Sequence, residues 1–523
     1  MSNKMDRPLV TVDGRTLMDR PLEPPNFVVD TLVSQGLHML TRMHTYEYDM
    51  VVIRSDATLT LIDSNTGNLQ HRFNAGETGW TKAADNATGD GIVTVTGGVI
   101  YGDAGSSIIN PCGIKILKGK LEMYGGSIVG IRNVYNANGG GVYVSDQCTF
   151  NMYGGSIKGC YVFSDGGGVY VAAGGTFTMS GSSAITNCKG SKGGAVYNAG
   201  TFTMRDNSHI ADCIYISSIA SGGGVHNKGT FTVEGGSITG SVNDYNREQS
   251  SDDICNENKL DVSEGITISC NVNVGYGGTI SKGTFTGRVW IYWEGTILGG
   301  TFTNEVINYE GRIKAGEFTG KIENSYGKID GGTFRGSVTS SGYNAIISDG
   351  NFHGTVTNES GATISGGTFD KNVTNKTYAT LNGGIFYGGV TNDGGKIEDG
   401  AYETVKFNSD NGAQAKEEKV LRGQKVAKPT DDPTKSGYTF TGWEDANGAG
   451  AYDFNTPVTA PLTLTAKWEK NPSSGGYYYY PTTDTKTTDT KGSPKTADPG
   501  VALYAALSIL SLTGMVALNG KKR

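Results

Sequence analysis

Charged residues are sparse in this chain, and they form no basic stripe. Lys and Arg together number 44 and Asp and Glu 51 in 523 residues, so the formal net charge is only −7. Domains that bind nucleic acid gather Lys and Arg on one face or in one stretch to neutralise phosphates. No such gathering occurs here, and we therefore expect no nucleic-acid partner.

The sequence also lacks the motifs of common catalytic and metal sites. Its six His residues show no HExxH or similar ligand spacing, and there is no Gly-x-Ser-x-Gly elbow or phosphate-binding loop. Glycoside hydrolysis requires two carboxylates at a defined separation. The only dense acidic group is Glu248, Asp252, Asp253 and Glu257, in an irregular stretch that we interpret as a solvated loop. We predict no catalytic residue, no metal site and no cofactor.

Cysteine is sparse as well, and the count of seven is odd, which excludes a fully paired disulfide framework in the monomer. Cys160, Cys188 and Cys213 each follow a repeated Ile by three residues, so we expect them at one position of three successive repeats. Two interpretations remain open. A ladder of small buried side chains is favoured, because no His or second Cys accompanies each one; the alternative is a metal or disulfide ladder.

Glycine, by contrast, is abundant. It supplies 80 residues, about twice the usual share of roughly 7 %, without the every-third-residue regularity of collagen. Thr, Ser, Asn and Tyr are also plentiful. Gly reaches positive φ without steric cost, and β-branched and aromatic residues fill pleated surfaces. The composition therefore predicts a mainly β protein of short strands and tight turns.

A repeat of 25–29 residues occupies residues 90–271. Its first phrase is Gly-Gly-Gly-Val-Tyr or a close variant, and its second is Phe-x-Met, in which both side chains share one face of a strand. The first phrase begins at residues 139, 166, 193 and 222. A unit of this length, with two or three short strands, cannot bury its apolar side alone and must stack on copies of itself. The repeat predicts a parallel β-helix.

The period shortens to 16–18 residues between residues 272 and 403. The repeated phenylalanines are Phe285, Phe302, Phe318, Phe334, Phe352, Phe369 and Phe386. Asn closes most units, at Asn308, Asn324, Asn358, Asn375 and Asn392. An Asn amide can bond to the same Asn on the next coil, so we interpret these residues as a ladder and not as a ligand site. We predict a second, short-coil β-helix here.

Together the repeats resemble the pectate-lyase-like β-helix repeats of bacterial surface proteins and autotransporter-like adhesins. The resemblance covers residues from about 90 to 402 and concerns repeat type, so it implies a fold more firmly than an activity. The same superfamily contains polysaccharide lyases and glycosidases. A surface carbohydrate-active enzyme is therefore the alternative to a non-enzymatic protein.

Residues 404–469 have a different sequence pattern, with regularly spaced aromatic residues. The motif residues are Val405, Phe407, Pro429, Pro433, Ser436, Gly437, Tyr438, Phe440, Gly442, Trp443, Tyr452, Phe454, Pro457, Leu462, Leu464, Ala466 and Trp468. They resemble the internalin-type B repeat, or Listeria-Bacteroides repeat, a small β-grasp-like module of Gram-positive surfaces. Trp443 and Trp468 are either core residues or ligand-stacking platforms, and the small size of the module favours the core.

The last part of the chain is expected to be an anchor. Residues 470–492 are of low complexity and predict a disordered, solvated linker suited to crossing a cell wall. Residues 501–518 are uncharged and mostly apolar, long enough as a helix of about 27 Å to span a bilayer core. Lys521, Lys522 and Arg523 would then hold the end on the cytoplasmic side.

The residues directly before this segment resemble the Leu-Pro-x-Thr-Gly sorting signal of sortase substrates. They are Ser493, Pro494, Lys495, Thr496, Ala497 and Asp498. The resemblance implies that a sortase cleaves between Thr496 and Ala497 and joins Thr496 to peptidoglycan, with only transient membrane contact. Ser493 stands in place of Leu and Ala497 in place of Gly, which bears on the class of sortase more than on the mechanism. A retained membrane helix is the alternative.

Residues 1–89 give no recognisable domain and are either the first β-helix coils or a truncated domain. Their opening shows no apolar run of a signal peptide. Attachment to the wall requires export, so we expect the N-terminus to be incomplete. The expected protein is a Gram-positive, wall-anchored adhesin or structural stalk. Its expected partners are sortase and peptidoglycan, with a host glycan, mucus or a matrix protein as ligand.

Overall fold

The computed structural model describes residues 112–116, 119–133, 138–216, 222–243, 253–448 and 450–472, and the backbone of eight short strands between residues 9 and 101. Nearly all of the elements are β-strands; the 3-10 turn η1 (Asp399–Ala401) is the helical one. Within this described part, no helix has the length and apolar character needed to cross a bilayer. The predicted linker beyond residue 472, the sorting signal and the apolar segment 501–518 lie outside it.

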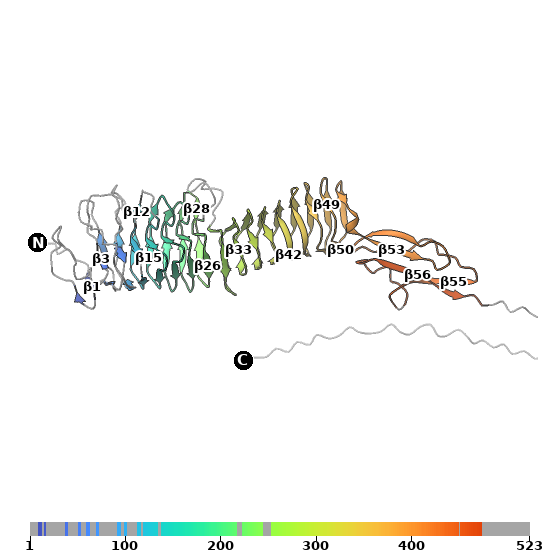
Figure 1. Cartoon of the computed structure of the whole chain (residues 1–523), viewed down its shortest axis with the longest axis horizontal. Helices are drawn as coiled ribbons and strands as arrows, with labels where there is room; N and C mark the ends of the chain where they lie inside the picture. Colours follow the sequence, from blue (N-terminus) through green and yellow to red (C-terminus); the bar gives the residue numbers. More distant parts are fainter. Residues whose placement is uncertain are drawn as a thin grey trace, which may run out of the picture. The chain divides into compact units, whose positions relative to one another are not determined.

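Residues 114–243 form long coils of four strands each, and the predicted parallel β-helix is confirmed (Figure 1). The first-sheet strands are β9 (Ile114–Ile116), β13 (Val142–Val144), β17 (Val169–Val171), β21 (Val196–Asn198) and β25 (Val225–Asn227). The second-sheet strands are β10 (Lys120–Met123), β14 (Thr149–Met152), β18 (Thr176–Met179), β22 (Thr201–Met204) and β26 (Thr230–Val233).

The third and fourth sheets complete each long coil. The third-sheet strands are β11 (Ser127–Val129), β15 (Ser156–Lys158), β19 (Ala184–Thr186), β23 (His209–Ala211) and β27 (Ser237–Thr239). The fourth-sheet strands are β12 (Arg132–Asn133), β16 (Tyr161–Val162), β20 (Lys189–Gly190), β24 (Ile214–Tyr215) and β28 (Val242–Asn243). The sequence predicts only two or three strands per repeat, because the fourth is two residues long and carries no repeated apolar phrase.

Strands before residue 102 extend the same sheets. They are β1 (Leu9–Val12), β2 (Arg15–Thr16), β3 (Leu37–Met39), β4 (Val51–Ile53), β5 (Leu59–Ile62), β6 (Gln70–Arg72), β7 (Ile92–Val95) and β8 (Val99–Tyr101). β7 and β8 pair in parallel with β10 and β11, and β4 pairs in parallel with β9. β1 pairs antiparallel with β2 and β5, and β3 with β4.

The coils shorten from four strands to three after β28. The transition coil consists of β29 (Ile254–Asn256), β30 (Lys259–Val262) and β31 (Thr267–Ile268). It is followed by β32 (Val272–Val274), which pairs with β29, so the repeat distance of this coil is 18 residues, from Ile254 to its register partner Val272. The third and fourth sheets end at β27 and β28, and both remaining strands of each short coil belong to the second sheet.

The short coils continue this arrangement in register, except that the two second-sheet segments of a coil are joined into one strand in β42 (Lys328–Phe334) and in β44 (Ile346–Phe352). Their first-sheet strands are β35 (Val289–Tyr292), β38 (Val306–Tyr309), β41 (Ile322–Ser325), β43 (Val338–Ser341), β45 (Val356–Glu359), β48 (Val373–Lys376) and β51 (Val390–Asp393). Their second-sheet strands are β33 (Thr279–Ile280), β34 (Thr284–Phe285), β36 (Thr296–Ile297), β37 (Thr301–Phe302), β39 (Arg312–Ile313), β40 (Glu317–Phe318), β42 (Lys328–Phe334), β44 (Ile346–Phe352), β46 (Thr363–Ile364), β47 (Thr368–Phe369), β49 (Thr380–Leu381), β50 (Ile385–Phe386) and β52 (Lys396–Ile397).

Phenylalanine ladders fill the interior, as the repeats predict. Within the ladders Phe150–Phe231 and Phe285–Phe386, neighbouring ring centroids lie 4.7–5.1 Å apart with planes within 11° of parallel. These rings are almost fully buried. Offset-stacked rings with centroids at this distance attract each other beyond their buried area. The ladders therefore stabilise both the core and the coil-to-coil register.

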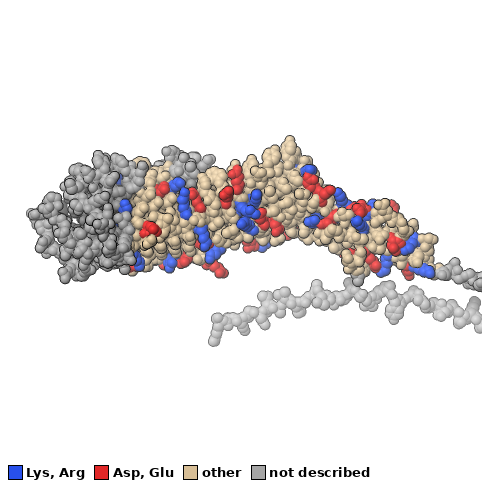
Figure 2. All heavy atoms as spheres, in the orientation of Figure 1, with Lys and Arg blue, Asp and Glu red and all other residues tan. Residues whose placement is uncertain are grey.

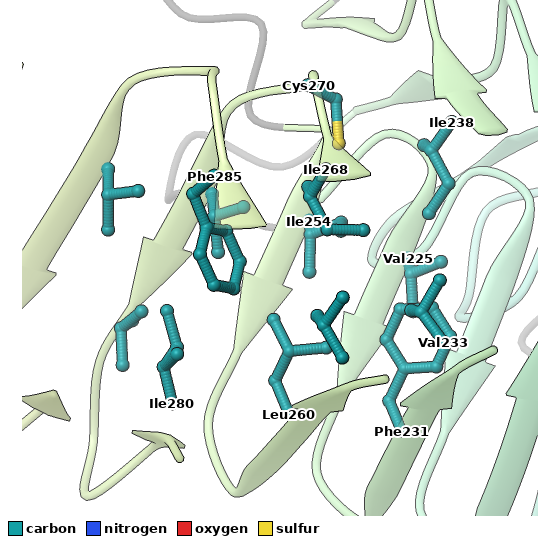
Figure 3. Close-up of a cluster of buried hydrophobic side chains, with 14 of the residues drawn as sticks. Val225, Phe231, Val233, Ile238, Ile254, Leu260, Ile268, Cys270, Ile280 and Phe285 are labelled. Atoms are coloured by element: carbon teal, nitrogen blue, oxygen red, sulfur yellow. The ribbon is translucent and has the colours of Figure 1, made fainter. Parts of the chain in front are cut away.

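The two phenylalanine ladders occupy different columns of the core. Phe231 is in register with Leu260, and Leu260 with Ile280, so the long-coil phenylalanine column continues as aliphatic residues. Phe285 is instead in register with Ile268 on β31 (Figure 3). The change of column lies at the transition coil, where the third sheet has ended and a second strand of the coil joins the second sheet.

A mixed four-stranded sheet follows the last coil. It consists of β53 (Tyr402–Asn408), β54 (Lys416–Leu421), β55 (Tyr438–Asp445) and β56 (Leu462–Lys470), in the order β54-β53-β56-β55. Its own core contains Val405, Phe407, Trp443 and Leu464. The turn after β54 contacts the final coil, because the Phe386 amide donates a 2.8 Å hydrogen bond to the Arg422 carbonyl.

Candidate ligand-binding surface

A row of exposed aromatic side chains follows the turns that come after the first-sheet strands of the short coils. We call it the aromatic row; it comprises Tyr276, Trp293, Tyr309, Tyr326, Tyr343 and Tyr378. Their exposed fractions run from 38 % at Tyr309 to 79 % at Tyr343. Like turns of successive coils stack on one another, so these rings lie along one edge of the solenoid.

Neighbouring rings of the row contact each other or the next turn. Ring centroids lie 5.0 Å apart for Tyr276 and Trp293 and 5.6 Å apart for Tyr309 and Tyr326. Tyr292 bridges these two pairs, at 5.8 Å from Trp293 and 6.2 Å from Tyr309.

Further along the row, rings lean over glycines of the following coil. A Cβ atom at Gly342 would lie 2.6 Å from Tyr326 Cδ1, and one at Gly361 would lie 2.5 Å from Tyr343 Cδ1. The absence of side chains at these two glycines therefore leaves space for the rings.

Four members of the row occupy backbone conformations that large side chains rarely adopt. The φ angles are +49° at Tyr276, +38° at Trp293, +58° at Tyr326 and +69° at Tyr378. A bulky residue in the left-handed region costs on the order of 1–3 kcal/mol. Gly342, at φ +95°, adopts positive φ in the corresponding turn without that cost. Turn geometry therefore does not account for the aromatic residues, and such outliers cluster at functional sites.

Charged side chains of both signs lie on the short coils and pair across neighbouring coils. Figure 2 shows Lys and Arg beside Asp and Glu on the face in view, with uncharged surface between them. Arg288 lies 2.9 Å from Glu305, and Lys376 lies 2.7 Å from Glu359. Exposed pairs of this kind stabilise a fold little. Because each pair joins opposite charges, the two pairs add no net charge to the surface.

The acidic group of residues 248–257 differs from the predicted solvated loop where it is described. Glu248 and Asp252 lie outside the described residues. Asp253 is buried, and its carboxylate accepts hydrogen bonds from the backbone N–H groups of Ser241 at 3.0 Å and Asn271 at 3.2 Å. Burial raises the pKa of the Asp253 carboxyl above its usual value, although these two hydrogen bonds act in the opposite direction. Its place between coils indicates a structural role.

Glu257 is also largely buried, so the solvated-loop interpretation is wrong for it too. Its Oε2 lies 3.1 Å from Lys228 Nζ, and its Oε1 lies 3.3 Å from His226 Nε2. Burial raises the pKa of Glu257, but the neighbouring His226 and Lys228 outweigh that effect and lower the pKa to about 2.

The cysteines form a ladder of small buried side chains, which is the interpretation that the sequence favours. Cys160, Cys188 and Cys213 are fully buried on successive coils, and none of the seven cysteines forms a disulfide. The Cys188 Sγ donates to the carbonyls of Thr186 at 3.4 Å and Ile157 at 3.8 Å. The pKa of the Cys160 thiol is raised well above its usual value by contact with Cys188 and by burial, and burial raises that of Cys188. Such thiols are poor metal ligands and poor nucleophiles.

Trp443 is a core residue, as the size of the module predicts, whereas Trp468 is half-buried. Trp443 is buried and lies edge-on to Phe407, with ring centroids 5.1 Å apart. Trp468 packs against the same core, and its Nε1–H donates a 3.0 Å hydrogen bond to the Ser409 carbonyl. The buried Trp443 ring is not available as a stacking platform for a ligand.

The predicted sorting-motif residues Ser493 to Asp498 and the basic end Lys521 to Arg523 lie outside the described part of the chain. The sequence interpretation did not identify the aromatic row. Alignment of the short repeats on their Asn would have revealed it, because Tyr309, Tyr326 and Tyr378 follow Asn308, Asn324 and Asn375 within three residues. The irregular offset, of one to three residues, hid the pattern.

Comparison with protein families identifies the module after the solenoid. Residues 404–467 match the family described as the Listeria-Bacteroides repeat domain, which confirms the resemblance in this part of the chain. Comparison with curated proteins gave no match, and comparison with solved structures gave none. Listeria-Bacteroides repeat domains are typical of bacterial surface proteins.

Proposed function

We propose that this chain is a non-enzymatic protein of the bacterial cell surface that binds a ligand along the aromatic row. The observation that carries the proposal is the row itself, in which six exposed rings follow one edge and four of them stand in strained turns. A large exposed apolar patch commonly marks an interaction site. The Listeria-Bacteroides repeat domain supports a surface location.

We infer that the aromatic row binds an extended glycan of a host surface or of mucus. Tyr and Trp present a flat apolar body with a polar tip, which suits the C–H faces and hydroxyl groups of sugar rings. Coils repeat about every 4.8 Å, so successive rings can contact successive parts of one polymer chain. A matrix protein is the other candidate ligand.

Binding of the full chain to immobilised mucin glycans, neutral polysaccharides and matrix proteins tests the assignment. We expect saturable glycan binding that falls about tenfold or more when Tyr343→Ala and Tyr378→Ala are combined, a loss of ~1.4 kcal/mol or more. Tyr387→Ala is the matched control, because Tyr387 is 47 % exposed but lies outside the row. Glycan binding that survives the double variant, or binding to matrix protein alone, would contradict the assignment.

Covalent attachment to peptidoglycan through the Ser493–Asp498 motif belongs to the same proposal. A sortase would cleave between Thr496 and Ala497 and transfer the Thr496 acyl group to the wall, leaving the apolar segment 501–518 behind. Mass spectrometry of protein released from walls by a muralytic enzyme tests this step. A C-terminal peptide that ends at Thr496 and carries a wall fragment is expected, and an intact Arg523 terminus would rule the step out.

The absence of catalysis is likewise part of the proposal. Screening the full chain against pectin, mucin and host glycans, with and without calcium, should detect no turnover. Reproducible release of reducing ends or of unsaturated sugars would instead favour the carbohydrate-active enzyme.

A further inference from the structure

A cluster of three potential metal ligands lies where the four-strand coils give way to three-strand coils. His226 lies on β25, Cys255 on β29 and Glu257 directly after β29. His226 and Cys255 are register partners on neighbouring coils. One ligand atom from each of the three side chains lies within 4.8 Å of the other two.

His226 and Cys255 follow three tyrosines in one column of the first sheet. Tyr143, Tyr170 and Tyr197 precede His226 in register, with ring centroids 5.1 and 4.9 Å apart and planes nearly parallel. His226 stacks on Tyr197 at 5.3 Å. Stacking explains the orientation of the imidazole ring, but it uses only the ring face and leaves both nitrogens without a role.

The nitrogens of His226 are the second observation that points to a ligand. The side chain is fully buried, yet neither Nδ1 nor Nε2 has a hydrogen-bond partner. Glu257 Oε1 lies 3.3 Å from Nε2 but outside hydrogen-bond geometry. Leaving a buried polar atom without a partner costs about 1–3 kcal/mol. An ion between these groups would remove that cost at Nε2.

The distance between His226 Nε2 and Glu257 Oε1 also suits a metal ion with tetrahedral coordination. Zinc binds His nitrogen and carboxylate oxygen at about 2.0–2.2 Å, so the two ligand atoms of such a pair stand about 3.3–3.5 Å apart across the tetrahedron. The 3.3 Å between His226 Nε2 and Glu257 Oε1 has this length. The bound of 4.8 Å on the other separations requires the Cys255 sulfur to move by about 1.5 Å at most.

We propose that His226, Cys255 and Glu257 bind a divalent transition-metal ion, zinc above all, with the fourth position open. Imidazole, thiolate and carboxylate together are a zinc donor set, and three protein ligands leave room for a water or a ligand group. Because the ligands come from two neighbouring coils, the ion cross-links β25 to the strand that starts the transition coil. It therefore fastens the solenoid where the third and fourth sheets end.

Metal binding by the tag-free full chain tests the proposal. After chelation and dialysis, titration with zinc chloride should show one tight site per chain, and zinc should raise the thermal midpoint. Cobalt should give the near-ultraviolet charge-transfer band of a thiolate ligand. His226→Ala, Cys255→Ser and Glu257→Gln should each weaken binding tenfold or more, and Cys255→Ser should abolish the band.

Two control variants separate this site from other binders. Cys213→Ala removes a buried thiol of the cysteine ladder, and His353→Ala removes an exposed imidazole paired with Asp370. Both should leave the stoichiometry and the cobalt band unchanged. Should Cys255→Ser fail to fold, Glu257→Gln still decides the matter, because Gln keeps the shape of the Glu side chain. Absence of a tight site in the parent chain, or binding unaffected by Glu257→Gln, would overturn the proposal.

Discussion

Asparagine side chains join neighbouring coils from within. Asn198, Asn227 and Asn256 are fully buried in one column of the first sheet, and each of the first two donates a 2.7 Å bond from Nδ2 to the next Asn Oδ1. Asn308 to Asn324 and Asn358 to Asn375 repeat the arrangement. The predicted Asn ladder is thus confirmed in the short coils. It also occurs in the long coils, where the sequence interpretation did not place it.

Replacing one member of this ladder should cost more than an ordinary hydrogen bond. In Asn227→Ala, the Asn198 amide loses an acceptor, and Asn256 Oδ1 and the Lys259 carbonyl lose a donor. Buried groups left without partners cost about 1–3 kcal/mol each, so we expect a loss of about 3 kcal/mol. Thermal unfolding and hydrogen exchange in β25 and β29 measure it.

Asn392→Ala is the control for this substitution. Asn392 ends the ladder and is exposed, so water can replace it as the acceptor for Asn375. We expect a change below about 1 kcal/mol. Equal losses for the two variants would show that burial of the ladder does not matter.

The cysteine ladder makes a prediction about pH. Contact with Cys188 and burial raise the pKa of Cys160, and burial raises that of Cys188, so the thiolate fraction of both stays small even at a pH where exposed thiols ionise. Alkylation of the folded chain at pH 8.5, followed by peptide mapping, should leave Cys160, Cys188 and Cys213 unmodified. The same reagent should label all three after unfolding. Rapid labelling in the folded state would indicate an accessible ladder.

At the scale of an element, the turn after each first-sheet strand of the short coils decides which residues are tolerated. These turns carry φ values that glycine accepts easily, yet aromatic residues occupy several of them. Where glycine does occur, at Gly342 and Gly361, the ring of the preceding coil covers it. These turns therefore present a ring, accommodate the ring of the preceding coil, or do both, as at Gly342 and Tyr343.

Gly342→Ala tests this dependence. The new Cβ would meet the Tyr326 ring at 2.6 Å and hold an L side chain at φ +95°. We expect a loss of about 1–2 kcal/mol and a displaced Tyr326, measurable by thermal unfolding and by weaker glycan binding. Ser360→Gly, at φ +55° in an equivalent turn, is the matched change in the opposite direction. It should leave stability unchanged or raise it slightly, and a comparable loss there would exclude backbone strain as the cause.

At the scale of the whole molecule, the solenoid is a sum of coils that contact mainly their neighbours. Val338, Val356 and Val373 are successive register partners, as are Phe352, Phe369 and Phe386. The final coil is covered by the turn after β54, where Gln424 bonds to the Phe386 carbonyl. The Listeria-Bacteroides repeat module thus closes this end of the ladder, as capping units do in repeat proteins.

Deleting residues 356–372 removes one whole coil and should leave a folded protein. Val373 would then pair with Val338, and Phe386 with Phe352, so every column is restored. Circular dichroism should stay β-rich, and the thermal midpoint should fall only modestly. Deleting residues 356–363 alone removes half a coil and breaks every column beyond it. A folded half-coil variant would contradict this nearest-neighbour description.

The sequence by itself determined the parallel β-helix, both coil lengths, the interior Phe and Cys columns and the Listeria-Bacteroides repeat module. Each of these depends on residues at a fixed repeat position, and stacking brings equal positions together whatever the details of the turns. Interior ladders are local to neighbouring coils, so periodicity is enough to predict them.

Tertiary structure alone decided where the columns change partners and what lies on the surface. Phe231 and Phe285 share a repeated phrase but not a column, because the third sheet ends between them. His226, Cys255 and Glu257 carry no ligand spacing in sequence, since the register of two coils brings them together. The aromatic row likewise depends on turns in which the number of residues between the Asn and the aromatic residue varies. Only the stacking of the coils places its rings on one edge.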